Sequence, residues 1–74
     1  PGYMSADDKE KYLHEVLGGT QVGDLAVRIG RTPETLHKML RETAKRLGIY
    51  EQWQTKMKEN RRDAAIRNLA AINN

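Results

Sequence analysis

The side chains best suited to chemistry in this 74-residue chain are charged groups that recur between residues 34 and 45. Glu34, Lys38, Arg41 and Lys45 lie three or four residues apart, so a helix would present them on one face. Arginine can bind a guanine edge through two hydrogen bonds, and lysine more often meets a phosphate. The spacing therefore predicts recognition of a polyanion rather than a reaction.

Nothing in the sequence is typical of a catalytic or metal site. The chain has no cysteine, its two histidines, His14 and His37, are far apart, and Ser5 is its only serine. Asp7 and Asp8 suit the start of a helix, where carboxylates complement the helix dipole. Because no nucleophile–base set, metal-ligand spacing or glycine-rich phosphate loop is present, we expect no enzyme activity, cofactor or metal.

A short helix followed by a tight turn is predicted just before the charged face. Leu25, Ala26 and Ile29 have helical spacing, and Gly30 can end the helix with a positive φ. Ala26 is expected to be small because the next helix crosses close to it. Gly23 weakens this first helix by about 1 kcal/mol relative to alanine.

The second helix of the pair is predicted over residues 33–47. Thr32 is a suitable N-cap, Pro33 fits the first helical position, and Glu34 complements the dipole in the first turn. One stripe of this helix is apolar and predicted to be buried, namely Leu36, Met39 and Leu40. The opposite face is predicted to be exposed and carries Glu34, His37, Lys38, Arg41 and Lys45. A DNA major groove accepts a helix of this kind.

The pattern resembles bacterial helix-turn-helix families over about half the chain, from Leu13 to Ile49. The run Asp24-Leu25-Ala26 with Ile29-Gly30, followed by Thr35-Leu36, is similar to sigma-factor region 4 and LuxR-type domains. Leu47-Gly48-Ile49 is also similar to the Fis-type C-terminal domain. Arg31 stands where these families usually carry an aliphatic residue. It is therefore expected either over solvent or DNA, or in a turn that is built differently.

The resemblance implies contacts to double-stranded DNA by polar residues of the turn and of both helices. Thr20 and Gln21 resemble residues that anchor such helices to phosphate through backbone N–H groups. For His37, a DNA contact and an idle exposed side chain are equal alternatives. The predicted nucleic-acid contacts are Thr20, Gln21, Arg31, Thr32, Glu34, Thr35, His37, Lys38, Arg41 and Lys45.

The charge of the chain is distributed unevenly along the sequence. Residues 1–27 contain two lysines and five acids, whereas residues 28–74 contain eleven lysines and arginines and five acids. The basic part begins where the helix pair lies, which favours a polyanionic partner.

A helix before the pair completes the predicted core. Ser5 and Asp8 form a plausible capping pair, Gly18-Gly19 ends this helix, and Thr20 can cap the next one. Its apolar stripe is Tyr12, Leu13, Val16 and Leu17. The core is predicted to contain Leu13, Val16, Leu17, Val22, Leu25, Ala26, Ile29, Leu36, Leu40 and Leu47.

A long C-terminal helix is predicted over residues 50–72, after a stop at Gly48. Ile49, Trp53 and Met57 recur every four residues and are expected to dock on the core. A polar stretch, 56–62, follows, in which Arg61 and Arg62 are either solvated or in reach of flanking DNA backbone. The apolar residues beyond it are Ala64, Ala65, Ile66, Leu69, Ala70 and Ile72. They form a frayed helix end, a self-association surface or a contact with another domain.

These observations predict an all-α protein with a three-helix helix-turn-helix core (5–49) and a long fourth helix (50–74). Residues 1–4 are interpreted as added residues or an upstream linker. We expect sequence-specific binding of double-stranded DNA in transcriptional regulation, in the cytoplasm of a bacterium or phage-infected cell, with no membrane contact. The alternatives are a DNA-targeting domain of a transposase, recombinase or phage packaging protein, and a helical protein-interaction module. Ile66, Leu69 and Ile72 are the predicted contacts to a second copy or a neighbouring domain.

Overall fold

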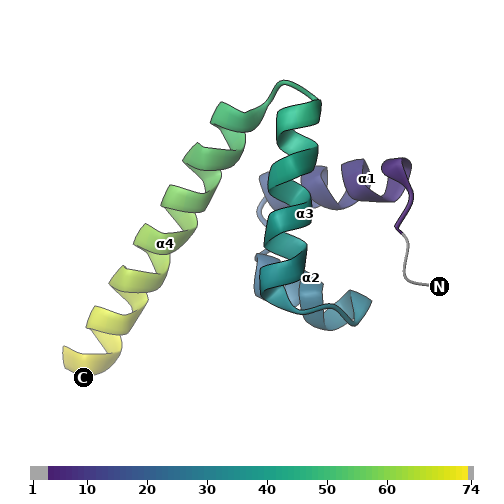
Figure 1. Ribbon diagram of the computed structural model, residues 1–74. Helices are drawn as coiled ribbons and strands as arrows, with labels where there is room; N and C mark the ends of the chain where they lie inside the picture. Colours follow the sequence, from purple (N-terminus) through teal and green to yellow (C-terminus); the bar gives the residue numbers. More distant parts are fainter. Residues whose placement is uncertain (1–3, 74) are drawn as a thin grey trace.

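The described part of the chain folds into four helices. The computed structural model describes the backbone of residues 4–73 and the side chains of residues 4–67 and 69. The helices are α1 (Ala6–Leu17), α2 (Val22–Ile29), α3 (Pro33–Arg46) and α4 (Tyr50–Asn73) (Figure 1). The predicted all-α architecture, with three short helices and a long fourth, is confirmed. Residues 1–3 of the predicted N-terminal segment lie outside the described residues.

The α2–α3 turn is built from local capping interactions. Gly30 adopts a left-handed conformation (φ 72°) at the end of α2, and the Arg31 N–H donates to the Ala26 carbonyl over 2.9 Å. The Thr32 hydroxyl then accepts from the Thr35 N–H over 3.2 Å, with Pro33 in the first turn of α3. These bonds satisfy backbone groups that the two helix ends leave free, which confirms the predicted stop and start.

The predicted cap at Thr20 is wrong. α1 begins as expected, with the Ser5 hydroxyl accepting from the Asp8 N–H over 3.1 Å. The Thr20 N–H, however, donates to the Glu15 carbonyl and belongs to the end of α1. α2 starts at Val22, and its N-cap is Gln21, which makes no side-chain capping bond.

The core is formed where α3 packs against each of the other helices, with α1 also packing against α4. Ala26 is 1% exposed, consistent with the predicted close crossing of α2 and α3. Four residues that the sequence placed in the core, Leu17, Val22, Ile29 and Leu47, are only partly buried at its edge. The buried apolar residues are Leu13, Val16, Leu25, Ala26, Leu36, Leu40, Ala44, Trp53 and Met57.

The end of α3 differs slightly from the prediction. The helix stops at Arg46, and Leu47 is its C-cap rather than its last residue. Gly48 has a φ of 73°, and the Ile49 N–H donates to the Ala44 carbonyl over 2.9 Å. Thr43, which was not predicted to be buried, is enclosed because its hydroxyl donates to the Met39 carbonyl over 2.8 Å.

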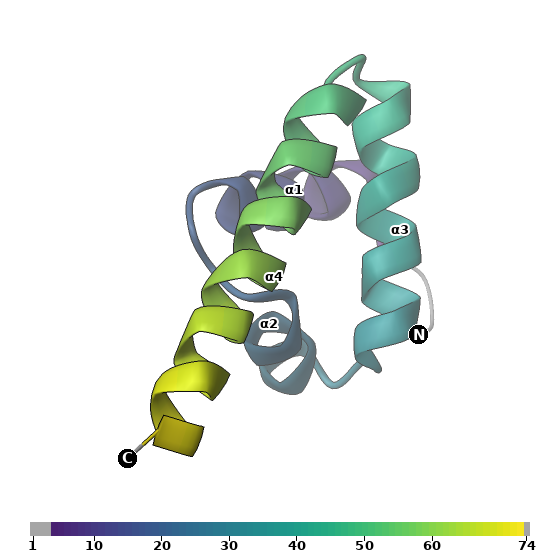
Figure 2. The same ribbon diagram turned by 90° about the vertical axis from the view of Figure 1, so that its left-hand side faces the viewer.

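α4 runs back along α3 and then diverges from it. Trp53, 2% exposed, and Met57 anchor its first half on the core, as predicted. Its second half extends past α2 (Figure 2) and gives the molecule an elongated shape of 44 × 27 × 17 Å. None of the described helices has the length and apolar character needed to cross a membrane.

Candidate nucleic-acid interface

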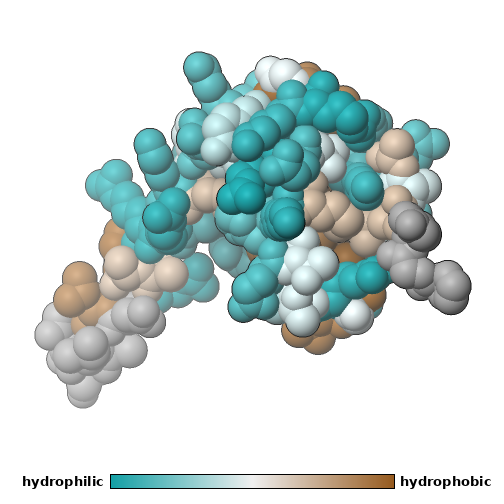
Figure 3. Space-filling model, viewed as in Figure 1, coloured by the Kyte–Doolittle hydropathy of each residue, from teal (hydrophilic) through white to brown (hydrophobic). Residues whose placement is uncertain are grey.

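The exposed stripe of α3 carries five of the ten predicted contacts. Glu34, Thr35, Lys38 and Lys45 are exposed, and Arg41 is half-buried at the edge of the stripe. Viewed from this side, the surface over α3 is mostly hydrophilic (Figure 3). The predicted amphipathic character of α3 is therefore present, with its polar stripe facing away from the core.

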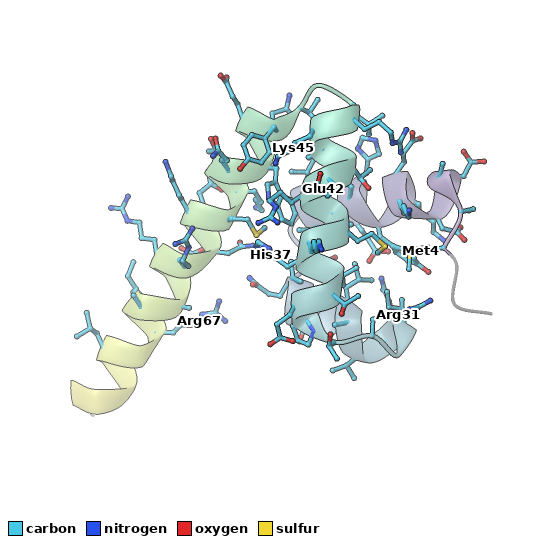
Figure 4. All side chains as sticks on the ribbon, in the orientation of Figure 1. Met4, Arg31, His37, Glu42, Lys45 and Arg67 are labelled. Carbon is cyan, nitrogen blue, oxygen red and sulfur yellow. The ribbon has the colours of Figure 1, made fainter. Side chains whose placement is uncertain are left out.

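His37 does not lie on the exposed stripe, which corrects the prediction. Its ring packs edge-on against Trp53, with 5.1 Å between the ring centroids and 62° between the planes. The side chain is half-buried and points from α3 toward α4 (Figure 4). Burial, and then the positive charges of Arg41 and Arg61, lower the pKa of His37 from its ordinary value of 6.5.

Glu42 reduces the positive charge of the second half of the stripe. Its Oε1 lies 3.9 Å from Arg41 Nε and 3.9 Å from Lys45 Nζ. Lys45 Nζ is also 5.2 Å from the centroid of the Tyr50 ring, which draws this lysine toward α4. Arg41 Nε is enclosed and has no hydrogen-bond partner. Buried donors without a partner are uncommon in folded proteins. The Arg41 side chain as a whole is 39% exposed at the edge of the stripe.

Several cations of residues 28–74 are engaged within the fold. Arg28 pairs with Glu15, Arg46 Nη1 lies 3.2 Å from Glu10 Oε1, and Lys56 pairs with Glu59 on the far side of α4. The first two pairs attach α2 and α3 to the acidic α1. Within the described part of the chain, the cations without an ion pair are Lys38, Lys58, Arg61, Arg62 and Arg67 among residues 32–73.

The residues of the α2–α3 turn are largely occupied by capping. The Thr32 hydroxyl donates to the Thr35 hydroxyl over 2.8 Å in addition to capping α3. Arg31 is half-buried at the turn (Figure 4). Thr20, in the earlier turn between α1 and α2, is bonded to α1 through its backbone. These predicted contacts are therefore less available to a ligand than the residues of the stripe.

A shallow hollow runs along the first half of α3 and is called here the α3 hollow. It has a volume of about 500 Å³ and brings the start of α2 beside the predicted contacts of α3. Its lining is Val22, Gly23, Pro33, Glu34, His37, Lys38 and Arg41. The structure thus places Lys38, Arg41 and His37 together, whereas Lys45 lies outside the hollow.

A second hollow, called here the α4 groove, lies between the start of α2 and the middle of α4. It has a volume of about 530 Å³ and is lined by Gln21, Val22, Gly23, His37, Met57, Asn60, Arg61 and Ala64. Arg61 is the functional candidate that the sequence did not distinguish from Arg62. Its position four residues after Met57 was the available signal, because that spacing returns to the buried face of a helix.

No group of three or more His, Cys, Asp or Glu side chains that could hold a metal ion occurs among the described residues. Comparison of the chain with protein-family models, with curated proteins and with solved structures identified no match.

Proposed function

We propose that this domain binds double-stranded DNA, with α3 entering the major groove. The observation that carries the proposal is the α3 hollow, where a well-capped helix presents Lys38, which has no ion pair, and the Arg41 side chain beside the start of α2. Lys38 suits a phosphate, and Arg41 suits either a phosphate or a guanine edge. Both a role in transcriptional regulation and a role in targeting a larger DNA-processing protein would use this mode of binding.

The positive charge that remains unpaired supports a polyanionic partner. Lys38 makes no ion pair. The arginines of α4 that make no ion pair also belong to residues 28–74, the part of the sequence that carries the excess of basic residues. Phosphate contacts by such groups release counterions, so the affinity should fall steeply as the salt concentration rises.

The test is a titration of the isotope-labelled domain with mixed-sequence duplex DNA at two salt concentrations. Amide shifts should concentrate in residues 21–24 and 33–42. Arg41→Ala should weaken binding by roughly 1–3 kcal/mol if Arg41 contacts a base, and Lys38→Ala should weaken it while reducing the salt slope by about 1. Lys58→Ala is the control: it removes one positive charge, as Lys38→Ala does, but from α4 instead of α3. It should weaken DNA binding less than Lys38→Ala. Unchanged amide shifts at low salt would contradict DNA binding.

A second candidate is a helical protein-interaction module, which the position of Glu42 favours. Its carboxylate lies within 3.9 Å of both Arg41 and Lys45 and offsets part of the charge of the stripe. This candidate predicts no response to duplex DNA in the same titration, so the one experiment separates the two.

A further inference from the structure

We infer that the α4 groove receives the sugar–phosphate backbone of the same duplex whose major groove takes α3, with Arg61 as the principal contact. The inference rests on the proposed function and adds a second contact surface to it. α4 would then both complete the core and flank the DNA.

The α4 groove lies where the sugar–phosphate backbone beside the DNA major groove is expected to pass. The α3 hollow and the α4 groove share Val22, Gly23 and His37 in their linings, so they form one continuous surface. α4 diverges from α3 along this surface (Figures 1 and 2). The DNA strand that borders the major groove occupied by α3 therefore has a continuous path between the start of α2 and the middle of α4.

The charge of the groove suits a phosphodiester. Arg61 is exposed and makes no ion pair, Asn60 adds an amide donor, and no acidic side chain lines the groove. Arg61 and His37 line the groove together. Arg67 projects from α4 on the side that faces α2 and α3 (Figure 4). The lining of the groove thus presents a cation and an amide but no acidic side chain.

Gly23 offers an independent indication that a ligand approaches here. It lies in the first turn of α2 and lines both the hollow and the groove. A Cβ at this position would meet no atom within 4 Å, and its φ is not positive. The fold therefore gains nothing from glycine, which is less favourable than alanine in a helix by roughly 0.5–1 kcal/mol. Close approach of a ligand to the backbone is a reason for its presence.

Arg61 and Arg62 form a matched pair for the test. They carry the same charge and are adjacent, but Arg61 lines the groove and Arg62 does not. Binding of a fluorescent duplex is measured by anisotropy for wild type, Arg61→Ala and Arg62→Ala over a series of salt concentrations. Arg61→Ala should weaken binding about 5- to 10-fold at low salt and reduce the salt slope by about 1, as expected for one lost phosphate contact. Arg62→Ala should change the affinity by less than about twofold.

Gly23→Ala separates a role in binding from a role in folding. The variant should unfold at a higher temperature than wild type, because the helix gains a better former in open space. It should nevertheless bind the duplex more weakly, because the added methyl group projects into the groove. A merely structural position would not show these opposite changes.

The outcomes distinguish the two proposals. If wild type fails to bind duplex DNA at low salt, the proposed function is wrong and the inference is lost with it. If wild type binds, but Arg61→Ala and Arg62→Ala lose equal affinity and Gly23→Ala binds like wild type, DNA binding stands and the groove is not its contact surface. A wild type that binds an acidic peptide but not DNA would assign the groove to a protein partner and overturn the inference.

Discussion

At the scale of single residues, the ion pairs within the exposed stripe of α3 decide which of its cations are available to an anion. Glu42 is shared by two cations, whereas Lys38 has no acidic partner. Pairs this exposed are weak, about 0–1 kcal/mol each, so they can be exchanged readily for phosphate contacts. Lys38 is therefore the cation of the stripe best prepared to bind an anion.

Glu42→Gln should strengthen DNA binding. The substitution removes one negative charge from beside Arg41 and Lys45, and the expected gain is about two- to fivefold in affinity at low salt. Fluorescence anisotropy with a labelled duplex measures the change. Glu51→Gln, which alters the net charge equally on α4, is the control and should give a smaller gain. Equal gains from the two variants would mean that only net charge matters.

His37 should make stability depend on pH. Its pKa is lowered in the folded protein by burial, Arg41 and Arg61, so the folded state binds this proton less readily than the unfolded state. Neutral His37 therefore does not lower stability above pH 6.5. The free energy of unfolding decreases as the pH falls from 6.5 through the lower pKa of the folded state. Urea unfolding at pH 7.5 and 5.5 should show a decrease that His37→Gln diminishes. An identical decrease in the variant would contradict this role for His37.

At the scale of helices, the crossing of α2 and α3 fixes the angle at which the stripe is presented. Ala26 lies at this crossing and is 1% exposed, so no space remains for a larger side chain. α3 is held on its other side by Trp53 and Met57 of α4. The exposed stripe is therefore positioned by packing on both flanks of α3.

Ala26→Leu should destabilise the fold by overpacking the crossing. A loss of about 1–3 kcal/mol in the free energy of unfolding is expected, measured by circular dichroism during thermal or urea unfolding. Ala65→Leu adds the same atoms at an exposed position of α4 and should change stability by less than about 0.5 kcal/mol. If the two variants were equally stable, α2 and α3 would not meet at Ala26.

At the scale of the whole molecule, the part of α4 from Arg61 onward has a side that lines the α4 groove and an opposite side with exposed apolar residues. Arg61 and Ala64 line the groove, whereas Ile66 and Leu69 are 56% and 60% exposed. Ile66 follows Met57 by about 2.5 helical turns, which places it opposite the core-facing side. Figure 3 shows apolar side chains on this outer part of α4. The Ile72 side chain lies outside the described residues.

We propose that the outer side of α4 mediates weak self-association. Two exposed apolar side chains cover far less than the roughly 800 Å² per partner of a stable interface, so dimers should form only at high micromolar concentration. Sedimentation should detect them for wild type and not for the double variant Ile66→Gln, Leu69→Gln. Val27→Gln removes another exposed apolar side chain (83% exposed) on α2 and should leave dimers intact. Monomers alone at all concentrations would exclude this surface.

The sequence by itself determined the four helices and most of their ends. Gly30, Thr32 and Gly48 act through bonds to residues within a few positions, so their roles follow from local chemistry. The spacing of Trp53 and Met57 likewise identified the docked side of α4. The sequence placed Thr20 at the start of α2, but its N–H donates to the Glu15 carbonyl at the end of α1, and Gln21 is the N-cap of α2.

The tertiary structure decided which side chains share a surface. The path of α4 covers His37, brings Arg61 rather than Arg62 beside α2, and leaves Lys38 accessible. Helical spacing restricts a residue to one face of its own helix, but the neighbour that this face meets depends on the crossing of helices distant in sequence. For this reason the stripe of α3 could be predicted from the sequence, whereas the α4 groove could not.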